Sequence, residues 1–115
     1  MDYFDCSTIG CDPTGKVLEA NTGIPQPAQG TVIPSVVEEK RKQIQSGTEL
    51  SITVWKDSMG VIYIQDGQHR FVASCIEGKK IKLNWKKFGY AAFRNGWGAT
   101  KHEKVTPAKE RIKSK

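Results

Sequence analysis

The 115-residue sequence contains no apolar run near the roughly 20 residues that a membrane-spanning helix needs. It also shows no N-terminal basic segment followed by an apolar stretch, so no signal peptide is predicted. These absences argue against a membrane protein. We expect a cytoplasmic protein, or a segment of a larger exported chain that acts in the cytoplasm of a target cell.

Cysteine is scarce, with Cys6, Cys11 and Cys75 as the only three. An odd number this small excludes a disulfide scaffold. Cys6 and Cys11 can pair or bind a metal, but no second Cys/His pair has ligand spacing, so we expect free thiols in a reducing compartment. Cys75 falls on the core side of an expected helix, where it would act as a small buried hydrophobe.

Acidic residues are nearly missing from the last third of the chain. Residues 79–115 hold two acidic and twelve basic side chains, whereas residues 1–78 hold ten acidic and six basic ones. A basic segment beside a mildly acidic body indicates a polyanionic partner, with nucleic acid preferred over a membrane surface. For residues 101–115 alone, a solvated and flexible basic tail is the preferred interpretation.

The N-terminal half predicts one helix after an irregular start. Residues 1–30 are rich in glycine and proline and are expected to be irregular, with room for one short strand. A brief strand is expected at 31–33. Ser35 and Glu38 have the spacing of a capping box, which predicts a helix over 36–45.

Two apolar alternations separated by a turn, at 50–55 and 61–65, predict a β-hairpin. The apolar period becomes helical over 67–78 and alternates again over 79–85. The order strand, helix, strand, strand, helix, strand predicts a small α+β fold with a mixed sheet and helices on one face.

The five residues Asp66-Gly67-Gln68-His69-Arg70 stand at the junction of an expected strand and helix. A helix that begins there presents unpaired amides and a positive dipole end, and Gly67 would let a ligand approach the backbone closely. His69 and Arg70 add donors and charge, so the junction predicts an anion site, with phosphate as the expected anion.

Chemistry at this junction is assigned to the titratable side chains. His69 titrates near neutrality and is the candidate acid/base, while Asp66 is a candidate helix cap, metal ligand or partner of the imidazole. An ordinary Asp-Gly turn with Asp66 as a simple cap is the structural alternative. Arg70 argues against that alternative, because a cation in the first helical turn opposes the dipole unless an anion compensates it.

Residues 31–85 resemble the ParB/sulfiredoxin superfamily, through "VIPSVVEEKRKQIQSG", "LSITVWKDSMGVIYIQDGQHRFVASCIEG" and "KIKLNW". The resemblance implies a ParB-like domain over 31–100 that handles phosphate or nucleotide. Sulfiredoxins place a catalytic cysteine where Gln68 stands, which argues against sulfinic acid reduction. No downstream helix-turn-helix is visible either, which argues against a partition clamp.

The leading hypothesis is therefore a ParB-like nuclease that cleaves DNA or RNA. Asp66, His69 and Arg70 would be catalytic, and Gly67, Gln68 and Arg70 would bind phosphate, with Mg²⁺ or a nucleotide as cofactor and Asp66 as a metal ligand. The cations expected to track the nucleic acid are Lys80, Lys82, Lys86, Lys87 and Arg94.

Aromatic residues in the basic third have two interpretations. Trp85, Phe88 and Trp97 can stack on bases or belong to the core, and for Trp85 the core is preferred. Size, charge and format also resemble the C-terminal domain of a polymorphic toxin, which implies an immunity protein as partner. The alternatives are a nucleotide-dependent phosphotransferase or NTPase, and a non-catalytic nucleic-acid-binding module.

Overall fold

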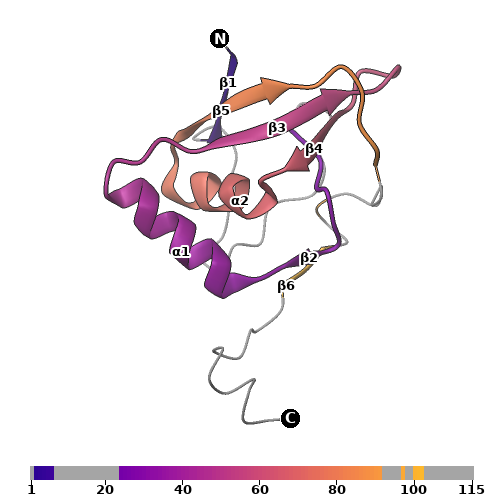
Figure 1. Cartoon of the computed structure of the whole chain (residues 1–115). Helices are drawn as coiled ribbons and strands as arrows, with labels where there is room; N and C mark the ends of the chain where they lie inside the picture. Colours follow the sequence, from indigo (N-terminus) through magenta and orange to yellow (C-terminus); the bar gives the residue numbers. More distant parts are fainter. Residues whose placement is uncertain (1, 7–23, 92–96, 98–99, 103–115) are drawn as a thin grey trace.

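A computed structural model describes residues 2–6, 24–91, 97 and 100–102. Its main sheet has four strands in the order β1, β5, β3, β4 (Figure 1). The β1–β5 and β3–β4 pairs are antiparallel and the β5–β3 pair is parallel, so the sheet is mixed. The strands are β1 (Asp2–Asp5), β3 (Ser51–Lys56), β4 (Ile62–Asp66) and β5 (Lys80–Trp85).

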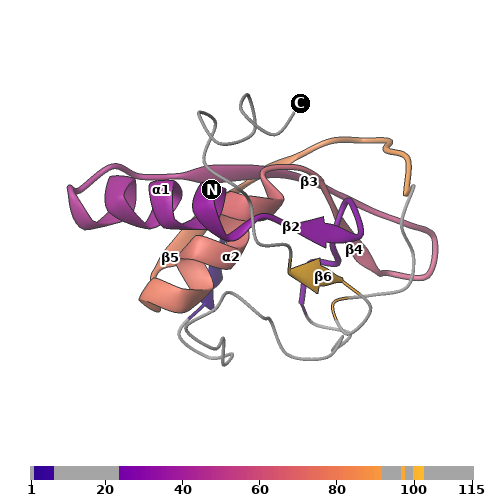
Figure 2. The same cartoon turned by 90° about the horizontal axis from the view of Figure 1, so that it is seen from below.

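Both helices, α1 (Pro34–Gln45) and α2 (Gln68–Glu77), lie on one face of this sheet and beside each other (Figures 1 and 2). Alternate strand residues are buried beneath them, including Ile52 in β3 and Ile81 in β5, and they meet Phe71 from α2 in one core. Alternation at period two places every second side chain on that face. The predicted α+β class, the hairpin and both helices are confirmed.

Strands near both ends of the chain pair with distant segments. Residues 1–30 were expected to be irregular with room for one short strand at an unspecified position. Residues 2–5 form the edge strand β1, and Phe4 packs on Phe71 with ring centroids 5.6 Å apart. The predicted strand at 31–33 exists as β2 (Thr31–Val32), but it pairs in parallel with β6 (Lys101–His102), outside the main sheet. The remainder of the expected tail, 103–115, lies outside the described residues.

The start of α1 is not a capping box. Its N-cap is Ile33, Pro34 occupies the first turn, and Ser35 already lies inside the helix; no side chain of the described residues caps it. The carbonyl of Ile33 accepts from Val36 N (3.0 Å) and Val37 N (3.1 Å). Proline is favoured in the first turn because its fixed φ suits a helix and its missing N–H has no partner to lose there.

Trp97 and Trp85 differ in burial, and only Trp97 belongs to the core. Trp97 is buried, stacks on Phe71 at 5.5 Å and donates from Nε1 to the carbonyl of Pro25 (2.7 Å), so it belongs to the core and not to a base-stacking surface. Trp85 is 41% exposed, so the preferred core role is wrong. Trp85 is the last residue of β5, beyond the β1–β5 pairing that ends at Leu83, and its Nε1 donates to the carboxylate of Asp2.

The two described cysteines have no visible chemical role. Cys6 is an unbridged, fully buried thiol, and Cys75 is buried within α2 as expected. Cys11 lies outside the described residues. Neither α1 nor α2, the helices of the described ranges, has the length and apolarity to cross a bilayer.

Candidate functional site

Gly67 forms the turn from β4 into α2. It is the N-cap of α2 at φ +99°, in the left-handed region that glycine enters without cost. A β-carbon at this position would lie 2.8 Å from Cγ2 of Ile52. The glycine is therefore required by the backbone conformation and by packing on β3, whether or not a ligand approaches the backbone there.

The junction lines a pocket of about 210 Å³ in which all five residues 66–70 take part. Other parts of the chain complete the wall: Ala28, Gln29, Val36, Lys40 and Gln65. Sequence reasoning missed this second set, because no local pattern marks these five residues as neighbours of the junction. We call this site the junction pocket.

Gln68 ties the start of α2 to residues 28–31. Its side chain is only 4% exposed, and its Oε1 accepts from Ala28 N (2.6 Å) and Gln29 N (2.9 Å). Its Nε2 donates to the carbonyls of Gln29 (3.0 Å) and Thr31 (3.3 Å). Because all four hydrogen bonds are internal, only the backbone amide of Gln68 stays available for the predicted phosphate.

His69 is held by the backbone that precedes α1. Its Nε2 accepts from Ile33 N–H at 3.0 Å, which places the proton of the neutral ring on Nδ1. Burial lowers the pKa of His69 below its ordinary value, and the positive charge of Lys40 lowers it further. His69 in this arrangement is a neutral hydrogen-bond donor, and it can act as a base at Nε2 only after releasing Ile33.

Arg70 and Asp66 form a loose pair at the edge of the pocket. Arg70 Nη1 donates to the carbonyl of Ser51 (3.2 Å) and lies 3.8 Å from Asp66 Oδ2. Asp66 is exposed and makes no capping hydrogen bond to α2, so the predicted cap is wrong. Its carboxylate instead offsets the charge that Arg70 brings to the positive end of the helix.

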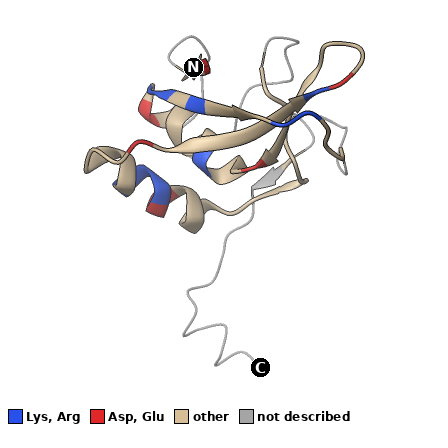
Figure 3. Ribbon diagram, turned by 45° about the horizontal axis from the view of Figure 1, so that its top comes forward, with Lys and Arg blue, Asp and Glu red and all other residues tan. Residues whose placement is uncertain are grey.

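None of the predicted nucleic-acid-tracking lysines lines the junction pocket. Lys82 lies between buried Ile81 and Leu83 and so projects from the face of the sheet opposite the helices, while Lys86 and Lys87 follow β5. Figure 3 shows blue segments on α1, β5 and the chain after β5. Lys80 precedes Ile81 at the start of β5, and Arg94 lies outside the described residues.

Metal binding stays a prediction. Among the described residues, no three His, Cys, Asp or Glu side chains gather as a metal-ligand group. Asp66 is the carboxylate within the junction pocket lining.

Comparisons with family models, curated proteins and solved structures find no match to this chain. The resemblance to the ParB/sulfiredoxin superfamily therefore has the residue pattern of 31–85 as its basis.

Proposed function

We propose that the junction pocket binds a phosphate group of a nucleic acid and that the chain hydrolyses the adjoining phosphodiester bond. One observation carries the proposal: two cationic side chains, Lys40 and Arg70, line the same pocket as the N-terminal end of α2. The first amides of a helix have no partner inside the helix, and its dipole favours an anion there.

Each pocket residue then has a task. The backbone amides of Gln68 and His69 and the side chains of Lys40 and Arg70 hold the phosphate oxygens, and Nδ1–H of His69 supplies a further donor. Asp66, exposed at the pocket edge, accepts the proton of the attacking water; one P–O ester bond breaks, and the leaving oxygen takes up a proton from solvent. Mg²⁺ prefers such carboxylate oxygens and would take its other ligands from phosphate and water, stabilising the developing charge.

A non-catalytic nucleic-acid-binding module is the second candidate. It is favoured by the hydrogen bond from Ile33 to His69 Nε2, which occupies the lone pair that a general base needs. In that case the pocket only docks a phosphate. The toxin role, the immunity partner and the target-cell cytoplasm remain predictions.

The test incubates the purified chain with single-stranded DNA, duplex DNA, RNA and labelled ATP, each with Mg²⁺ and with EDTA. Polynucleotide cleavage that falls roughly 10²–10⁴-fold in Asp66→Asn supports the nuclease. Phosphate release from ATP without cleavage supports a phosphotransferase or NTPase, and retention of nucleic acid without turnover supports the binding module.

Two lysines of α1 provide a matched pair for the same assay. Lys40 lines the pocket, whereas Lys42, two residues later, is exposed and outside it. Lys40→Gln is expected to weaken phosphate binding and cleavage while Lys42→Gln leaves both unchanged. Equal effects of the two substitutions would remove the pocket from the mechanism.

A further inference from the structure

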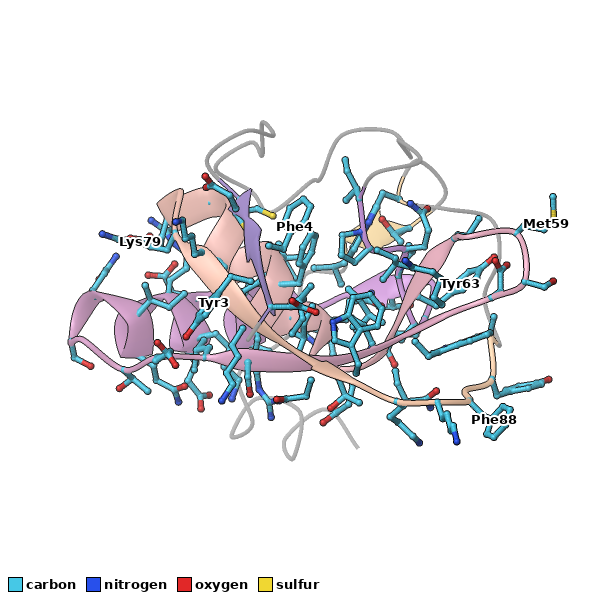
Figure 4. All side chains as sticks on the ribbon, turned by 90° about the horizontal axis from the view of Figure 1, so that it is seen from above. Tyr3, Phe4, Met59, Tyr63, Lys79 and Phe88 are labelled. Carbon is cyan, nitrogen blue, oxygen red and sulfur yellow. The ribbon has the colours of Figure 1, made fainter. Side chains whose placement is uncertain are left out.

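A second concave surface lies at the opposite end of β4, beside the turn that joins β3 to β4. It encloses about 470 Å³ between that turn and the chain after β5. Met59 from the turn and Phe88 from the later chain project at this same end of the molecule (Figure 4). We call it the hairpin hollow, lined by Trp55, Lys56, Asp57, Ser58, Met59, Lys87, Phe88 and Gly89.

Large aromatic side chains in and beside this hollow are exposed to solvent. Phe88 is 79% exposed and Tyr90 is 78% exposed. Scattered exposed apolar residues need no explanation, but aromatics grouped in and beside one concave surface indicate a binding site.

Cations lie beside these rings. Lys86 and Lys87 precede Phe88, and Lys56 Nζ lies 5.5 Å from the centroid of the Trp85 ring. The carboxylate of Asp57 accepts hydrogen bonds from two amides of its own turn, at 2.9 Å each, so it is committed to that turn. The surface thus combines flat apolar groups with positive charge.

Trp55 adds a buried donor in the hollow wall. The residue is 8% exposed and stacks on Tyr63 at 5.1 Å, yet its Nε1 has no hydrogen-bond partner within the part of the chain that the structure describes. The chain at Gly89 packs so closely on the indole that a β-carbon there would overlap it. An unpaired buried N–H lowers the stability of the fold. A ligand oxygen that enters the hollow and displaces the segment at Gly89 would accept a hydrogen bond from Trp55 Nε1.

The segment 86–90 links the hairpin hollow to the junction pocket. Lys86 N donates to the carbonyl of Val54 (2.7 Å), and Tyr90 N donates to Oε1 of Gln65 (3.2 Å). Gln65 also lines the junction pocket. Because the two sites lie at opposite ends of β4, they are separated by about the length of this strand, five residues or roughly 17 Å.

We propose that the hairpin hollow and segment 86–90 bind single-stranded nucleic acid, with bases stacked on Phe88 and Tyr90 and phosphates on Lys86 and Lys87. The strand then leads past Gln65 to the junction pocket. Single strands are favoured over duplexes because a base can stack on an exposed ring only when it is unstacked from its neighbours. This inference rests on the proposed function, whose substrate class it narrows.

The experiment measures binding of the full chain to a fluorescein-labelled 12-nucleotide single strand and to the matching duplex, by anisotropy in EDTA over a series of salt concentrations. Phe88→Ala/Tyr90→Ala should weaken single-strand binding at least tenfold and leave duplex binding unchanged. Lys86→Gln/Lys87→Gln should also weaken it and lower the slope of log affinity against log salt by about 0.7 per lost contact.

Control variants carry the same kinds of change at the other end of the sheet and on α1. Tyr3→Ala removes a partly exposed ring from β1, and Lys42→Gln/Lys79→Gln removes two exposed charges. Both should bind as the unsubstituted chain does. Equal affinity for single strand and duplex, or equal loss in control and test variants, would overturn the inference.

Failure of the inference and failure of the proposed function give different results. If Phe88→Ala/Tyr90→Ala binds and cleaves normally while Asp66→Asn is inactive, the inference fails and the nuclease stands. If the aromatic variant loses binding but the unsubstituted chain cleaves nothing, the inference stands and the nuclease fails. No binding of the single strand by the unsubstituted chain overturns the inference and leaves the surface to a protein partner.

Discussion

Replacing Gln68 by leucine removes four hydrogen bonds that join α2 to the chain nearly 40 residues earlier. Two amides, those of Ala28 and Gln29, lose their acceptor, and two carbonyls, those of Gln29 and Thr31, lose their donor. Leucine has a similar volume, so little of the change comes from an empty cavity. The substitution therefore removes these four hydrogen bonds and changes little else.

The expected loss of stability depends on how many of the four hydrogen bonds water can replace. A net contribution of about 0.5–1.5 kcal/mol for each bond gives an upper range near 6 kcal/mol for four. Gln29 is exposed, so water can serve its two groups, whereas Ala28 and Thr31 are partly buried. We expect Gln68→Leu to lower the free energy of unfolding by about 2–4 kcal/mol.

Urea unfolding followed by circular dichroism measures this change, with Gln45→Leu as the control. Gln45 is exposed and makes a 3.3 Å bond to Glu77, so its replacement should change stability by less than about 0.5 kcal/mol. Phosphate affinity should fall in Gln68→Leu as well, because Ala28 and Gln29 line the junction pocket. If Gln68→Leu is no less stable than the control, the four bonds do not hold the pocket wall.

Two further predictions concern the junction. His69→Leu leaves Ile33 N–H without an acceptor and should cost about 1–3 kcal/mol, whereas His69→Gln offers a replacement acceptor and should cost less. Because the folded pKa of His69 is lowered, its stabilising contribution is present above the ordinary value of 6.5 and is lost as pH falls through the lowered value. Urea unfolding at pH 5 and pH 8 should thus show a larger acid loss for the unsubstituted chain than for His69→Gln, and equal losses would contradict the burial of a neutral ring. Gly67→Ala should lower the free energy of unfolding by about 3 kcal/mol or more, since it adds a clash with Ile52 to the strain of φ +99°. Gly60→Ala, at φ +86° in open space, should lower it by only about 1–2 kcal/mol. Similar losses for the two variants would refute the packing of Gly67 on Ile52 as the cause.

Elements that depend on nearby residues could be predicted from the sequence. The β3–β4 hairpin has clean alternation on both sides of its turn, and α2 has a helical apolar period that Gly78 ends at φ +65°. The capping box failed even though it is local, because Pro34 is better suited to the first turn of α1 than to the position before it.

Contacts between distant segments could not be predicted. The strand at 2–5 is held by pairing with β5, and no local sequence pattern predicts that pairing. Lys40 reaches the junction pocket only because α1 packs beside α2, and Gln68 bonds to a segment nearly 40 residues away. Sequence periodicity reports which face of an element is apolar, but it does not report which element will cover that face.

Some groups of the junction motif hold the fold together, and others line the junction pocket. Gly67 makes the turn, the side chain of Gln68 hydrogen-bonds to the pocket wall at Gln29, and Nε2 of His69 accepts from the backbone N–H of Ile33. These groups stabilise the fold and are not available to a ligand. What remains toward a ligand is a set of donors: helix amides, Nδ1–H of His69 and the guanidinium of Arg70. A set of donors recognises an anion but removes no proton, so hydrolysis requires the carboxylate of Asp66, and binding does not. Asp66→Asn should therefore separate the two proposed functions, because it can abolish cleavage while phosphate binding persists.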